Sequence, residues 1–116
     1  MDLHVSMVTF DAMDAPVLAA WWADALGGEV VSDPGAAVVA VQLPQGLQLG
    51  FRTVAEPTPG KNRVHLDLAD VAADDQLKRL QDLGAAVLRR HEMESYSWVV
   101  LADPEGNQFC LATAPM

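Results

Sequence analysis

The two halves of this sequence resemble one another. Residues 46–53 and 106–113 share a glycine, a glutamine and a threonine at matching places, with large apolar residues between them, at an offset of 60 residues. Two further pairs of segments repeat at offsets of 57 and 56: 26–31 with 83–88, and 10–11 with 66–67. Because the three pairs occur in the same order at nearly the same offset, they predict a duplicated module of about 55 residues.

Each half has the pattern of a strand, a helix and three further strands. In the first half, Asp14 is a suitable N-cap, Pro16 suits a first helical turn, and Gly27 can end the helix. In the second half, Asp70 and Gly84 are expected to begin and end the corresponding helix. Alternating apolar residues predict strands at 7–11, 29–32, 37–43, 47–53, 63–68, 86–89, 97–102 and 107–113.

The predicted fold class is α+β, with two tandem βαβββ modules. A chain of 116 residues is expected to form a single domain over residues 1–116. Module one covers about 1–54 and module two about 63–116. Residues 55–62 contain two prolines and a glycine but no large apolar residue, which indicates a linker.

Charge and hydropathy narrow the possible partners and location. Sixteen acidic and seven basic residues give a formal charge of −9, which disfavours nucleic-acid binding. The longest apolar runs are far too short to span a membrane, and no basic, apolar leader begins the chain. Cys110 is the only cysteine, so no internal disulfide can form, in keeping with a reducing compartment. We therefore expect a cytoplasmic protein without nucleic-acid or membrane partners.

Alternation along the strands separates an apolar face from a more polar one. The turn residues Asp103, Pro104 and Gly106 belong to neither face. The residues expected to pack against the helices are Val8, Phe10, Leu49, Phe51, Val64, Leu66, Leu68, Phe109 and Leu111. The opposite face is expected to carry Met7, Thr9, Asp11, Gln48, Gly50, Arg52, His65, Asp67, Gln108 and Cys110.

With these features the chain resembles the vicinal oxygen chelate superfamily of glyoxalases, bleomycin-resistance proteins and extradiol, ring-cleaving dioxygenases. More narrowly, it resembles the small glyoxalase-like domain proteins of that superfamily. The resemblance covers essentially the whole chain and is carried by residues 14–27, 61–68, 83–85 and 98–111, the last of which contain the Asp-Pro-Glu-Gly-Asn turn.

The resemblance implies that each module forms a curled mixed sheet, or half-barrel, with the helices on the convex side. A ligand would then lie in the concave cavity. Trp98 and Tyr96 would offer it a stacking surface, although packing explains large aromatic residues equally well. The expected ligand-binding residues are Met7, Thr9, Asp11, Gln48, Arg52, His65, Trp98, Gln108 and Cys110.

Metal-dependent members of this superfamily place His, Gln or Glu ligands on the first and last strands of each module. The corresponding positions here are Met7 (or Thr9, if the register shifts by two), Gly50, His65 and Cys110. Only His65 is of the usual type, because glycine has no side chain and methionine is a poor ligand for hard or borderline ions. No cofactor is therefore expected.

A rebuilt divalent metal site is the alternative. Cys110 could bind a soft metal beside His65, and Asp11 or Asp67 could supply an oxygen ligand.

His65 and Cys110 each have two interpretations. His65 is either a histidine hydrogen-bonded to Asp67 or a backbone carbonyl, or a catalytic acid–base and ligand-anchoring group paired with Asp67. Cys110 is either a small buried residue or part of a thiol–imidazole nucleophile.

The expected function is that of a glyoxalase-like small-molecule binding protein, without the usual family metal site, for a cationic or apolar ligand. The alternative is an enzyme of the same superfamily, of the lyase, isomerase or dioxygenase type, either metal-assisted or using His65 and Asp67 as an acid–base pair. We also expect a homodimer, because Trp21 and Trp22 present more aromatic surface than one helix face hides.

Overall fold

The computed structural model describes residues 4–32, 35–60, 62–95 and 97–113. The chain is built of two compact units, Met1–Pro57 and Thr58–Met116. Within the described residues, the first unit contains β1 (Met7–Ala12), α1 (Ala15–Leu26), β2 (Glu29–Val30), β3 (Val39–Gln42) and β4 (Gln48–Thr53). The second contains β5 (Asp67–Leu68), α2 (Ala73–Asp82), β6 (Ala86–Glu92), β7 (Ser97–Ala102) and β8 (Gln108–Ala112).

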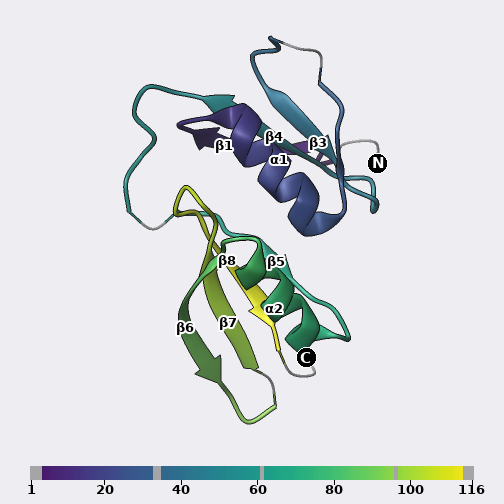
Figure 1. Cartoon of the computed structure of the whole chain (residues 1–116), viewed down its shortest axis with the longest axis vertical. Coiled ribbons are helices and arrows are strands. Elements are labelled where there is room, and N and C mark those ends of the chain that lie inside the picture. The colour runs from purple at the N-terminus through teal and green to yellow at the C-terminus, as the bar shows by residue number, and fades with distance from the viewer. Residues whose placement is uncertain (1–3, 33–34, 61, 96, 114–116) are drawn as a thin grey trace. The chain divides into compact units, whose positions relative to one another are not determined.

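Each unit combines one mixed sheet with one helix in the part of the chain described (Figure 1). The strand order is β1-β4-β3-β2 in the first unit and β5-β8-β7-β6 in the second. In both, the first strand pairs in parallel with the last, and the remaining neighbours are antiparallel. The predicted α+β class with two βαβββ modules is confirmed.

The turns before β4 and β8 have the same backbone hydrogen bonds. In the first turn, the Leu43 N–H donates to the Leu47 carbonyl and the Gly46 N–H donates to the Leu43 carbonyl. In the second turn, the Asp103 N–H donates to the Asn107 carbonyl and the Gly106 N–H donates to the Asp103 carbonyl. The fourth residue is Gly46 in one turn, with φ 106°, and Gly106 in the other, with φ 87°. Because a side chain would oppose this φ, the two glycines mark equivalent turns at an offset of 60 residues.

One of the three predicted repeats has a different offset in the structure. Thr9 pairs with Gly50 across β1 and β4, and Asp67 pairs with Cys110 across β5 and β8. Gly50 and Cys110 are equivalent at an offset of 60, so the counterpart of Asp67 is Thr9 and not Asp11. The match of 10–11 with 66–67 was wrong by two residues, because a shift of two leaves every side chain on its own face and keeps the pattern intact.

Helix α1 has the boundaries that its sequence predicts. The Asp14 side chain accepts a hydrogen bond from the Val17 N–H at 3.3 Å, and Gly27 ends the helix with φ 65°. Trp22, on the inner face, is fully buried. Phe10 lies between Trp22 and Phe51, with ring centroids 5.9 and 5.1 Å apart, respectively, as the predicted packing face requires.

Trp21 lies at the edge of this core. Its ring meets that of Trp22 edge to face, with centroids 5.1 Å apart and planes at 81°. Trp22 is fully buried and Trp21 only half-buried, so one indole lies near the edge of the buried stripe, as expected from the 100° between neighbouring helical residues.

Helix α2 buries the stripe formed by Ala73, Leu77 and Leu80. It begins later than predicted, with Ala72 rather than Asp70 at the N-cap and no side-chain cap. The Asp70 carboxylate instead accepts from the Ala72 N–H at 3.0 Å and from the Gln76 side chain at 2.9 Å, which holds the loop before the helix. Neither α2 nor the other helix of the described residues has the length and hydropathy needed to cross a membrane.

Two strands of the second sheet differ in length from the prediction. The strand expected over 63–68 is reduced to β5, and Val64, placed on the packing face from the sequence, is 72% exposed. Leu66 is half-buried. Strand β6 is longer than expected and continues to Glu92.

The Asp103 turn has the structural role predicted for it. Its buried carboxylate accepts hydrogen bonds from the backbone N–H groups of Glu105 and Asn107, both at 2.9 Å, and from the Asn107 side chain. A buried charge needs such partners, and here they close the turn that leads into β8.

Candidate functional site

Three chemically reactive side chains meet on one face of the second sheet. Asp67 and Cys110 are direct partners in the parallel pair of β5 and β8, so their side chains project from the same face. His65 comes two residues before Asp67, ahead of β5, and its imidazole reaches the Asp67 carboxylate. One ligand atom from each of the three lies within 4.8 Å of the others. Of the two carboxylates that were candidates to stand beside His65 and Cys110, Asp11 and Asp67, this cluster contains Asp67.

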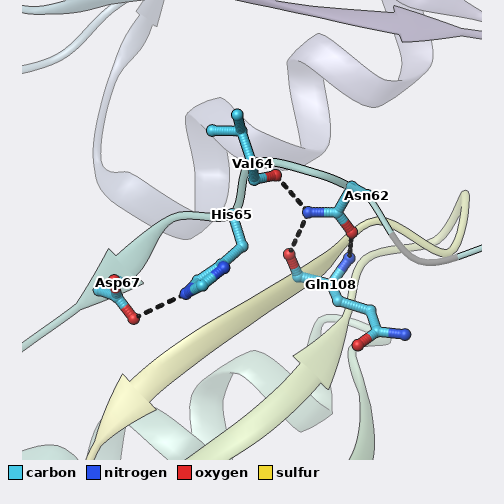
Figure 2. Close-up of polar contacts among 5 residues, drawn as sticks. All are labelled: Asn62, Val64, His65, Asp67 and Gln108. Carbon is cyan, nitrogen blue, oxygen red and sulfur yellow. Dashed lines mark hydrogen bonds and ion pairs between the residues drawn. The ribbon is translucent and has the colours of Figure 1, made fainter.

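Contact between His65 and Asp67 is direct and open to solvent. His65 Nε2 lies 3.3 Å from Asp67 Oδ1 (Figure 2), and the two side chains are 44% and 76% exposed. At this exposure the pair contributes little to folding, because solvent screens it. The imidazole is nevertheless oriented by a carboxylate, which is the arrangement of an acid–base or metal-binding histidine.

Asn62 ties the segment that carries His65 to β8. Its Oδ1 accepts from the Gln108 N–H at 2.9 Å, and its Nδ2 donates to the Gln108 carbonyl at 3.2 Å and to the Val64 carbonyl (Figure 2). At the equivalent place in the first unit, the Gln48 N–H donates to the backbone carbonyl of Ser6. A side-chain amide thus takes the place of a strand partner, which explains why β5 is short.

Sequence reasoning missed Asn62, which it placed at the end of the linker. The available signal was the chemistry of asparagine, whose side chain carries both an amide donor and a carbonyl acceptor like the backbone. Nothing in the strand pattern indicates which backbone groups it would meet.

The same face of the second sheet carries an aromatic pair and a polar pair. Trp98 pairs with Ala112, two residues beyond Cys110, so its side chain is on the face of the cluster. The rings of Trp98 and His91 are stacked, with centroids 4.8 Å apart and planes at 16°. Gln108, two residues before Cys110, accepts from Arg89 at 3.1 Å. Tyr96, the other candidate for stacking, lies outside the described residues.

In the first unit the candidate residues also share one face of their sheet, but with different chemistry. Asp11 forms an ion pair with Arg52 at 3.1 Å. Gln48 donates from its side chain to the Gln42 side chain at 2.9 Å. Both pairs are internal to the first sheet, so Asp11 is already matched by a cation there.

The positions equivalent to the cluster are closely packed in the first unit. Met7, Thr9 and Gly50 correspond to His65, Asp67 and Cys110, respectively. A Cβ added at Gly50 would lie 2.6 Å from Met7 Sδ and 2.9 Å from Thr9 Oγ1.

Position 50 of the first unit therefore has no free space for a metal-binding side chain. Met7 and Thr9 fill the space in which a ligand at position 50 would stand. In the second unit, His65 and Cys110 are suitable donors at their family positions, with Asp67 as a third.

Comparison with known proteins gives a consistent picture. The family model of the glyoxalase-like domain matches residues 7–112. No match was found among curated proteins.

Solved structures with the same fold cover nearly the whole chain. One is a glyoxalase/bleomycin resistance protein/dioxygenase family enzyme from Burkholderia phytofirmans, with a TM-score of 0.80, 18% identity, and coverage of 97% of this chain and 100% of that chain. A superfamily member from Sphaerobacter thermophilus has a TM-score of 0.73, 22% identity, and coverage of 95% and 96%. A mutant of the fosfomycin resistance protein FosX from Listeria monocytogenes, complexed with Mn(II) and a dihydroxypropylphosphonic acid, has a TM-score of 0.80, 12% identity, and coverage of 100% and 93%.

Proposed function

This chain belongs to the glyoxalase-like domain family, and we propose that within it the protein binds a small molecule without the metal centre that other members build from both modules. The ligand is held on the face of the second sheet that carries His65 and Trp98. Fold alone does not identify an activity, so the proposal depends on the chemistry of this face.

The observation that carries the proposal is the packing around Gly50. The Met7 thioether and the Thr9 hydroxyl fill the place of a ligand side chain, and Val38 lies as close on a third side, 2.9 Å from an added Cβ. A side chain able to bind metal at position 50 would have to displace all three. This packing supports the proposal that position 50 of the first unit supplies no ligand to a metal ion.

The second sheet offers the features of a small-molecule site. Trp98 is half-buried, and its stacking on His91 presents a rigid aromatic surface. Asp67 is largely exposed, which favours a cationic group on the ligand. A flat apolar molecule with a positively charged substituent combines both features.

A thermal-shift comparison of charged and neutral aromatic compounds tests this proposal. Benzamidinium and its neutral counterpart benzamide serve as the first pair of probes, because they differ in charge but not in outline. A ligand that prefers the folded state raises Tm as its concentration increases. We expect benzamidinium to raise Tm more than benzamide, and Asp67→Asn to remove the difference.

Two further variants locate the site. Trp98→Leu should weaken the response to both probes, whereas Gln81→Ala, on the exposed side of α2, should leave it unchanged. The proposal is contradicted if Trp98→Leu and Asp67→Asn respond to both compounds as the unmodified protein does. Mass spectrometry of what copurifies then identifies the natural ligand.

An enzyme is the second candidate, favoured by the 3.3 Å contact of His65 with Asp67. A carboxylate that orients an imidazole is typical of a general base, which would take a proton from a bound oxygenated substrate. Conversion of a copurifying compound, lost in Asp67→Asn and in His65→Ala, would favour this function over binding alone.

We also propose that the protein is a cytoplasmic homodimer. Trp21 at the edge of its core and the exposed Val17 side chain give α1 an apolar outer surface. Light scattering that gives a monomer at high protein concentration would contradict this proposal.

A further inference from the structure

We infer that Arg89 is an anion anchor on the ligand face, by which we mean the face of the second sheet that carries Asp67 and Trp98. The bound molecule is then an aromatic zwitterion, whose carboxylate meets Arg89 while its cationic group meets Asp67. This inference rests on the proposed function and names the class of ligand. Arg89 lies on β6 and Asp67 on β5, which are the two edge strands of the sheet. The ligand face therefore carries opposite charges at its two edges.

The strand register places both charged residues in one row across the sheet. Asp67 of β5 pairs with Cys110 of β8. Val100 of β7 continues the row, because it pairs with Cys110 on one side and with Arg89 on the other. The side chains of such a row project from the same face. Three strand spacings of about 4.8 Å separate the two charged residues by about 14 Å at the backbone, a span that their side chains shorten.

A β-bulge in β6 brings Arg89 to this face. Val87 pairs with Leu101 on the opposite face, and under strict alternation Arg89, two residues later, would share that face. The register shifts between Val87 and Arg89, so that Arg89 pairs with Val100 instead. Bulges that re-aim a side chain are common at sheet edges and beside active sites, so the irregularity supports a functional role for Arg89.

Hydrogen bonds hold the guanidinium in position. Arg89 Nη2 donates to Gln108 Oε1 at 3.1 Å. Because Gln108 is on β8, the Arg89 side chain reaches inward across β7 and not out over the sheet edge. Asn62 fixes the backbone of Gln108 in turn, accepting from its N–H at 2.9 Å and donating to its carbonyl at 3.2 Å (Figure 2). The donor is therefore preorganised, which lowers the cost of binding an anion.

The chemistry of Arg89 suits a carboxylate. A guanidinium carries five N–H donors in a planar fork, and Gln108 accepts through a single oxygen. Arg52, on the corresponding face of the first sheet, is paired with Asp11 at 3.1 Å, whereas Arg89 has no carboxylate partner among the residues that the structure describes. A ligand carboxylate can therefore form the bidentate pair that arginine favours.

Trp98 supplies an aromatic surface beside the row. It is half-buried on β7, two residues before Val100, and β7 lies between the two edge strands. A ligand ring that stacks there can meet both edges only if its charged groups point in opposite directions, as para substituents do. This geometry selects a ring with a cationic group at one end and a carboxylate at the other.

Para-carboxybenzamidine has these two groups on one ring and tests the inference beside benzamidinium, benzoate and benzamide. Isothermal titration of the unmodified protein should show that the zwitterion binds about 10-fold more tightly than benzamidinium, the factor expected from a hydrogen bond between charged groups. Benzoate should likewise bind more tightly than benzamide. Both comparisons use the unmodified protein, so neither depends on a variant folding.

Variants of two neighbouring arginines assign the effect. Arg89→Met removes the guanidinium and should abolish the preference for the zwitterion, whereas Arg89→Lys keeps the charge and should retain only part of it. Arg90→Met is the matched control, because Arg90 pairs with Val99 and lies on the opposite face. It should keep the full preference. Benzamidinium should bind Arg89→Met at least as tightly as the unmodified protein, since a like charge is removed.

Failure of this inference is distinct from failure of the proposed function. Equal affinity for the zwitterion and benzamidinium, or a preference that survives in Arg89→Met, overturns the inference even if benzamidinium still binds better than benzamide. Equal affinity for benzamidinium and benzamide contradicts the proposed cationic site instead, and benzoate then decides the role of Arg89. That role is supported if benzoate is preferred over benzamide by the unmodified protein and not by Arg89→Met, and any other result overturns it.

Discussion

Asp67 lies directly beside Cys110 in the second sheet, where the first sheet has Thr9 beside Gly50. The duplicated module thus places the same positions together twice. In one copy they form a dense contact with the Met7 thioether, and in the other they present a carboxylate, a thiol and an imidazole. Duplication supplies the geometry, and divergence of a few side chains gives the two copies different functional groups at these positions.

The packing at Gly50 predicts the effect of adding a single methyl group. Gly50→Ala should destabilise the protein by about 1–3 kcal/mol, because the new Cβ meets Met7 Sδ at 2.6 Å and Val38 and Thr9 at 2.9 Å. Met7→Ala in the same chain should recover part of this loss, since it removes the nearest atom. Urea denaturation of the two single variants and the double variant measures the coupling. Additive free energies of unfolding would show that the two residues do not compete for space.

The Asn62 amide predicts a local change in hydrogen exchange. In Asn62→Ala the Gln108 N–H loses its acceptor and should exchange faster. In Asn62→Asp the acceptor remains, but the second carboxylate oxygen faces the carbonyls of Gln108 and Val64 and repels them, so protection should fall there too. The Cys110 N–H, bonded to the Leu66 carbonyl, is the internal reference and should stay protected in both. We expect Asn62→Ala to cost about 1–3 kcal/mol, the penalty for an unsatisfied, partly buried donor. Equal protection of Gln108 in all three proteins would mean that Asn62 does not hold this edge.

The features that follow from local chemistry could be predicted from the sequence. Asp14, Pro16 and Gly27 mark the ends of α1 because caps depend only on neighbouring residues. The period of two in the strands likewise places Phe10 and Phe51 on the packing face.

Features that depend on contacts between distant segments could not be predicted. The short β5 results from Asn62 bonding to a residue 46 positions away. The choice between Asp11 and Asp67 as the neighbour of Cys110 required the register of β5 against β8, which no local pattern contains. Helix α2 starts later than predicted because the Asp70 carboxylate accepts hydrogen bonds from the Ala72 N–H and the Gln76 side chain in the loop before the helix. From the sequence alone, this aspartate cannot be told from an N-cap.

Asp70 predicts a small, testable acid sensitivity. Its pKa is lowered, chiefly by the hydrogen bond from the Ala72 N–H and then by that from the Gln76 side chain. A pKa that is lower in the folded chain stabilises the fold above the unfolded value of about 4, and this contribution is lost as pH falls through the folded value. Asp70→Asn should therefore lower Tm at pH 7 but flatten the decline of Tm below pH 4. Parallel Tm profiles for both proteins across that range would contradict the assignment.

His65 should matter for the ligand or metal and not for the fold. Its side chain is 44% exposed and its contact is with a still more exposed carboxylate, so His65→Ala should change the free energy of unfolding by less than about 1 kcal/mol. Leu111, only 2% exposed on the opposite face of the adjoining strand, should cost about 2–5 kcal/mol as Leu111→Ala, through lost burial and the cavity left behind. Leu66→Ala should fall between them, because Leu66 is half-buried. Chemical denaturation of the three variants gives this order directly. Should His65→Ala prove as destabilising as Leu111→Ala, the histidine is a structural residue, and the proposed ligand face loses one of the groups on which it is built.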